Sequence, residues 1–79
     1  MSGSLCFEIN YPRRYIKGGT SSEINAIEKL FGEYPITLDE KQIPQLKAMM
    51  VVYEYKPNVY KNIIEAIEKY GSIRLDVEY

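Results

Sequence analysis

The sequence predicts a small two-layer α+β domain with the element order β-α-β-α-α-β, in which a three-stranded, mainly antiparallel sheet carries helices on one face. Apolar and polar residues alternate near both ends of the chain, which indicates half-buried strands. Between them, apolar residues recur at helical spacing, and glycine or proline separates the segments. With 79 residues, the chain is expected to form one compact domain over residues 1–79, because a chain of this length builds a single core.

The two predicted terminal strands cover residues 5–11 and 72–79. One face of the first is expected to carry Leu5, Phe7, Ile9 and Tyr11, and one face of the last Ile73, Leu75, Val77 and Tyr79. Both alternate cleanly, so we expect them to pair at or near the centre of the sheet. The opposite, polar face would then carry Glu8, Arg74, Asp76 and Glu78.

The first helix is expected to begin at Thr20, because Thr20 and Glu23 have the spacing of a capping box. Its apolar face would consist of Ile24, Ile27, Leu30 and Phe31. Gly32 is placed to end the helix in a left-handed conformation. Residues 34–38 are predicted to form a short strand, and Pro35 favours an edge position because proline cannot donate to a ladder.

The middle of the chain permits two interpretations. Asp39 is a good helix cap, but Pro44 lies too deep for the first turn of a helix that starts at residue 40. Either a short turn spans residues 39–43 and a new helix starts at Pro44, or one helix bends there. Residues 51–55 fit a strand as well as a helix, and we favour a helix through about residue 54.

The last helix is expected to start around Pro57, since proline suits the first helical position. Its apolar stripe would consist of Tyr60, Ile63, Ile64, Ile67 and Tyr70, and Gly71 would end it. No apolar run approaches the roughly 18 residues of a membrane span, and the N-terminus lacks the pattern of a secretory signal. We therefore expect a cytoplasmic protein with no membrane partner, in which the single cysteine, Cys6, is an inert packed thiol.

Residue types exclude several chemistries. The chain has no histidine and one cysteine, which removes ordinary zinc sites and the Ser-His and Cys-His nucleophiles. Neither a phosphate loop nor a dinucleotide-binding fingerprint is present. Asp76 and Glu78 share a strand face, where bare surface charge is a simpler interpretation than a cation site. The prediction is therefore a non-enzymatic protein with no catalytic residue, no cofactor and no metal.

Residues 11–22 form a basic loop in a chain of net charge −1. Residues 1–20 carry three cations and one acid, whereas the remainder carries seven cations and ten acids. An anion or nucleic-acid site would use the cations and tyrosine Arg13, Arg14, Tyr15 and Lys17 together with the helix start at Gly18, Gly19 and Thr20. The alternative is a plain connection between strand and helix, in which Thr20 and Glu23 already satisfy the helix amides.

Eight tyrosines exceed what a small core holds. Tyr53, Tyr55 and Tyr60 lie near one another in sequence around Lys56-Pro57-Asn58, and tyrosine favours interfaces because its ring supplies area and its hydroxyl a hydrogen bond. These three residues are the predicted partner-binding site. The first hypothesis is a protein-binding module, of the accessory or inhibitor kind carried by viruses and mobile elements. The alternatives are a nucleic-acid or nucleotide-phosphate binder that uses loop 11–22, and a small structural protein that self-associates through a strand edge.

Overall fold

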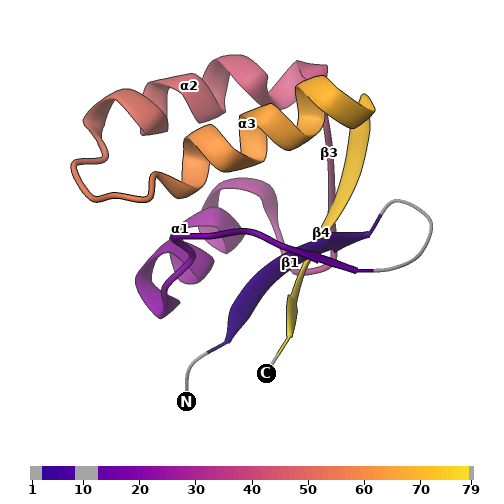
Figure 1. The fold of residues 1–79 in the computed structure, drawn as a ribbon, viewed down its shortest axis with the longest axis horizontal. Helices are drawn as coiled ribbons and strands as arrows, with labels where there is room; N and C mark the ends of the chain where they lie inside the picture. Colours follow the sequence, from indigo (N-terminus) through magenta and orange to yellow (C-terminus); the bar gives the residue numbers. More distant parts are fainter. Residues whose placement is uncertain (1–2, 9–12, 79) are drawn as a thin grey trace.

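The structure is a computed structural model that describes residues 3–8 and 13–78. Its elements follow the order β1 (Ser4–Glu8), β2 (Arg14–Tyr15), α1 (Ser21–Phe31), β3 (Ile36–Asp39), the 3-10 turn η1 (Glu40–Gln42), α2 (Ile43–Val52), α3 (Val59–Tyr70) and β4 (Ser72–Glu78) (Figure 1). The α+β class and the order of the expected elements are confirmed. The expected sheet of three strands is corrected to four, because two residues of the basic loop pair with β1 as β2.

The sheet has the order β2-β1-β4-β3, with antiparallel pairing throughout. The two terminal strands form its central pair, with Leu5 opposite Val77 and Phe7 opposite Leu75, as their alternation predicted. β3 lies at one edge, the position that Pro35 favoured. The expected continuation of the first strand through Ile9 and Tyr11 lies outside the described residues.

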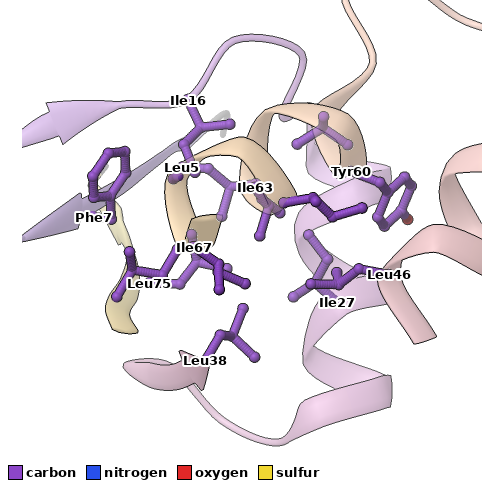
Figure 2. Packing of buried hydrophobic residues seen from close by; sticks show 14 of the residues in the cluster. Leu5, Phe7, Ile16, Ile27, Leu38, Leu46, Tyr60, Ile63, Ile67 and Leu75 are labelled. Atoms are coloured by element: carbon purple, nitrogen blue, oxygen red, sulfur yellow. The ribbon is translucent and has the colours of Figure 1, made fainter. Parts of the chain in front are cut away.

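One face of the sheet packs against the helices. Leu5 and Phe7 of β1 and Leu75 of β4 meet the apolar stripe of α3, where Ile63 and Ile67 are fully buried (Figure 2). α2 runs beside α3 (Figure 1) and contributes Leu46 to the same cluster. The predicted stripe of α3 is confirmed, with Tyr60, Ile63, Ile64 and Ile67 buried and Tyr70 packed against them, and its burial stabilises the fold.

The ends of α1 agree with the sequence only in part. Thr20 is the N-cap, but its hydroxyl donates to the Glu23 carboxylate at 2.5 Å instead of accepting from a backbone amide. The threonine half of the predicted capping box is therefore wrong. Gly32 ends the helix at φ 104°, a conformation that side chains other than glycine rarely adopt.

The middle of the chain follows the first of the two interpretations. Asp39 caps η1, with its carboxylate accepting from the Lys41 amide at 2.9 Å, and α2 begins afresh with Pro44 in its first turn. The favoured helix is confirmed for residues 51 and 52 but ends before residue 54, because Tyr53 is extended and residues 53–55 form no strand.

Asn58, not Pro57, starts α3. The Asn58 side chain accepts from the amides of Tyr60 and Lys61 at 3.1 and 3.2 Å, so Pro57 lies outside the helix. The side-chain amide of Asn58 also donates to the Met50 carbonyl at 3.1 Å, which fixes the connection between α2 and α3 at both ends. Across residues 3–8 and 13–78, no helix has the length and apolar character needed to cross a membrane.

Candidate functional site

A surface pocket lies between the N-terminus of α1 and the connection from α2 to α3. Its volume is 430 Å³. The segment that leads into α1 contributes Gly18, Thr20, Ser22 and Glu23, and the α2–α3 connection contributes Tyr53, Tyr55, Lys56 and Pro57. The fold thus brings part of the predicted basic loop and two of the predicted partner-binding tyrosines, distant in sequence, to one place.

The three predicted tyrosines contact one another but differ in exposure. The Tyr53 ring lies 5.5 Å from that of Tyr55 and 5.4 Å from that of Tyr60, centroid to centroid, both in edge-on geometry. Tyr60 is only 2% exposed and lies at one end of the core (Figure 2), so it supports Tyr53 from beneath. Tyr55 is 73% exposed. A partner that docks on the folded protein therefore meets Tyr53 and Tyr55.

Glu23 joins the two walls of the pocket. Its Oε1 atom accepts from the Thr20 hydroxyl and, at 2.7 Å, from the Tyr53 hydroxyl. Burial opposes ionisation of this carboxyl, but the hydrogen bonds from Thr20 and Tyr53 outweigh it and hold the Glu23 pKa below its ordinary value. The hydrogen bond between Tyr53 and Glu23 also raises the pKa of Tyr53 to about 12. At neutral pH the pocket therefore contains a fixed carboxylate and a hydroxyl that holds the loop in place.

Three exposed apolar residues lie at the end of α2 and in the connection that follows it: Val51, Val52 and Tyr55. We call this group the apolar tip; its Tyr55 also lines the pocket. The two valines form the last turn of α2 and are 78% and 70% exposed. Because both valines are mostly exposed, they contribute little to the core and leave apolar surface in contact with water at this end of α2. The sequence showed both valines, but the uncertainty between helix and strand at residues 51–55 hid their exposure.

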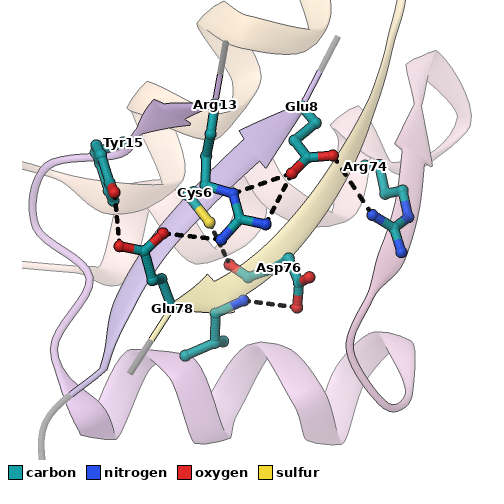
Figure 3. A network of polar contacts seen from close by, with 8 residues as sticks. Cys6, Glu8, Arg13, Tyr15, Arg74, Asp76 and Glu78 are labelled. Carbon is teal, nitrogen blue, oxygen red and sulfur yellow. Dashed lines mark hydrogen bonds and ion pairs between the residues drawn. The ribbon is translucent and has the colours of Figure 1, made fainter. Parts of the chain in front are cut away.

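Arg13 is engaged in ion pairs on the polar face of the sheet. Its guanidinium donates to Glu8 Oε1 at 2.7 and 3.0 Å and to Glu78 Oε2 at 2.8 Å (Figure 3). Tyr15 donates to the other oxygen of Glu78 at 2.7 Å. The hydrogen bonds from Tyr15 and Arg13 hold the Glu78 pKa below its ordinary value. This confirms that the polar face carries Glu8 and Glu78, and it assigns Arg13 a role in the sheet.

The two glycines of the predicted loop hold it close to the rest of the fold. Gly18 has φ 94°, and a Cβ atom there would lie 2.4 Å from the Pro57 carbonyl oxygen. A Cβ on Gly19 would lie 2.7 Å from Leu5 Cδ1. Both residues therefore permit close packing. The predicted anion site at the start of α1 has its glycines against the protein, and Glu23 provides a carboxylate where an anion would sit.

The remaining cations of the loop lie elsewhere. The Arg14 guanidinium lies 5.4 Å from the centroid of the Tyr70 ring on α3, and the Lys17 side chain is exposed. The Lys17 carbonyl accepts from the Asn62 side chain at 2.9 Å, which ties this part of the loop to α3. Arg13 is thus separated from Arg14 and Lys17, which lie on the side of α3, a separation that the sequence could not reveal.

Cys6 is fully buried beneath the polar face, with its thiol donating to the Asp76 carbonyl at 3.6 Å. Burial raises the pKa of this thiol above its ordinary value, which disfavours the reactive thiolate. Its prediction as a packed thiol is confirmed. Among the residues that the structure describes, no three cysteine, aspartate or glutamate side chains are grouped to hold a metal ion.

Comparison with known proteins adds nothing to this geometry. No protein-family model matches the chain, and neither the curated proteins nor the solved structures give a significant match.

Proposed function

We propose that this chain is a small, non-enzymatic protein-binding module that contacts its partner through the apolar tip and the adjoining pocket. The observation that carries the proposal is the exposure of Val51, Val52 and Tyr55 beside a pocket with aromatic walls. Interfaces are enriched in aromatic side chains that are rigid and desolvated at their centre. An accessory or inhibitor role in a virus or mobile element is the class of function that fits a module of this kind.

Preorganisation supports this surface as a binding site. Tyr53 is held by Glu23 on one side and by the buried Tyr60 ring on the other. The Asn58 side chain donates to the Met50 carbonyl and so fixes the backbone of the α2–α3 connection on which Tyr53 and Tyr55 lie. A side chain inserted by a partner therefore meets walls that lose little freedom on binding, and binding of this kind costs less entropy.

Nucleic-acid binding by loop 11–22 has weaker support. Binding through charge needs a broad basic face that neutralises several phosphates, whereas Arg13 is held by Glu8 and Glu78. The alternative of self-association rests on the edge strands β2 and β3, which another copy of the chain could pair with. A measurement of mass in solution as a function of concentration tests it.

The test of the proposal is selection of a displayed random-peptide library on the immobilised protein. We expect enriched peptides to carry apolar or aromatic residues and to lose at least about tenfold in affinity on Tyr55→Ala, as a residue at an interface centre does. Leu30→Ala is the matched control, because Leu30 is an exposed apolar residue of α1 that does not line the pocket. Equal affinity of the selected peptides for wild type and Tyr55→Ala would reject the proposal.

A further inference from the structure

A second groove lies on the other side of the loop, between β2 and α3. It has a volume of 330 Å³. Phe7, Tyr15, Ile16 and Lys17 line it from the sheet side, and Asn62, Glu65, Ala66, Lys69 and Tyr70 line it from α3. Neighbouring residues of the loop line the two hollows, Lys17 the groove and Gly18 the pocket.

Positive charge gathers around this groove. The Lys69 ammonium lies 5.3 Å and the Arg14 guanidinium 5.4 Å from the centroid of the same ring, Tyr70. Lys17 adds a third cation at the opposite wall, and Glu65 is the only acid that lines the groove in the described part of the chain. Neither lysine makes an ion pair with any described carboxylate. Like charges brought together in this way repel one another, and an anion relieves that repulsion.

The arrangement differs from a nucleic-acid site. The Tyr70 ring is in contact with two cations, so a base would have to displace them in order to stack on it. The groove is also short and its walls are partly apolar, with Phe7, Ile16 and Ala66 among them. Such walls suit a polypeptide whose acidic side chains alternate with small apolar ones.

We infer that the groove between β2 and α3 binds an acidic segment of polypeptide, whose carboxylates are held by Lys17 and Lys69 while its apolar side chains rest on the groove walls. The choice of a polypeptide over other polyanions rests on the proposed protein-binding function, since the groove and the pocket flank the same loop. The attraction of the groove for an anion does not depend on that function. None of the residues of the apolar tip lines this groove.

The experiment is an amide NMR titration at low salt with a short synthetic peptide of alternating glutamate and alanine. We expect shifts at Lys17, Asn62, Lys69 and Tyr70, reversed by added salt, and no shift there with the matching peptide of alternating lysine and alanine. The double variant Lys17→Glu/Lys69→Glu should lower the affinity by about tenfold or more, since like charges now face each other. Lys29→Glu/Lys47→Glu is the matched control, because it changes the net charge by the same amount at two exposed lysines outside the groove.

Three results would overturn the inference. The first is an unchanged spectrum at high concentrations of the glutamate peptide. The second is equal affinity of Lys17→Glu/Lys69→Glu and of its control for the glutamate peptide. The third is tighter binding, at the same four amides, of a single-stranded oligonucleotide of equal charge, which would make the groove a nucleic-acid site. The variant Tyr55→Ala should leave the titration unchanged, so failure here and failure of the proposed function are distinguishable.

Discussion

The substitution Tyr53→Phe removes one hydroxyl and leaves the rest of the pocket wall in place. That hydroxyl links the α2–α3 connection to α1 through its 2.7 Å bond to Glu23. The ring itself keeps its edge-on contact with Tyr60, because that contact does not involve the hydroxyl. The substitution therefore isolates a single hydrogen bond between two segments 30 residues apart.

A hydrogen bond to a charged group contributes about 1.5–3 kcal/mol to the free energy of unfolding. Glu23 and Tyr53 are both partly exposed, so water competes for the bond and we expect about 1.5 kcal/mol, the lower end of that range. For a domain of this size, 1 kcal/mol corresponds to a change in Tm of about 4–8 °C. Tyr53→Phe should therefore lower Tm by about 6–12 °C.

Urea denaturation followed by circular dichroism measures the effect, with an unchanged dependence on denaturant as the sign that the unfolded state is unaffected. Tyr55→Phe is the matched control. It makes the same chemical change on a tyrosine that is 73% exposed, where we expect a change within about 0.5 kcal/mol. A cycle that adds Glu23→Gln should give a coupling of about 1 kcal/mol. A Tyr53→Phe protein as stable as Tyr55→Phe, with no coupling to Glu23, would refute the reasoning.

Four further predictions concern stability. Gly18→Ala should destabilise the protein more than Gly32→Ala in urea denaturation, because both residues have positive φ but only Gly18 faces a backbone atom at 2.4 Å; equal losses would contradict this. Ile67→Ala should cost about 2–5 kcal/mol, since Ile67 is fully buried, and a loss under about 1 kcal/mol would contradict its place in the core. Arg13→Ala should destabilise the protein much less than Ile67→Ala in the same assay, because water competes for its partly exposed ion pairs with Glu8 and Glu78; an equal loss would contradict this. Finally, the Tyr53 pKa is raised from 10 to about 12, so the stability from its bond is complete below pH 10 and lost as pH rises toward 12; the difference between wild type and Tyr53→Phe should disappear over that interval, and a constant difference would contradict the assignment.

The parts of the fold that the sequence predicted depend on local periodicity. The alternation in residues 72–78 and the stripe of α3 each persist over most of their element, so the buried face follows from spacing alone. β2 could not be predicted in this way, because two residues are too few to show a period. It is defined only by its pairing in the folded sheet, where Arg14 lies opposite Phe7 and Tyr15 opposite Cys6.

The candidate site shows the same division. The sequence indicated Tyr53 and Tyr55, since tyrosine around a turn favours an interface. It could not show that Tyr60 faces the core, because position 60 belongs at once to the tyrosine cluster and to the apolar stripe of α3. Nor could it separate the cations of the basic loop. Arg13 and Arg14 are neighbours in the chain, and the alternation of side chains at the start of β2 sends them to different surroundings.

Photo-crosslinking from position 55 tests the central claim, that the apolar tip is a protein-binding surface. A benzophenone amino acid replaces Tyr55 in one variant and Leu30 in a second, and each variant is irradiated in cells of the organism that encodes it. The account predicts a discrete crosslinked partner from position 55 and none from position 30. The same crosslinks from both positions, or none from position 55 while a partner is captured from position 30, would contradict it.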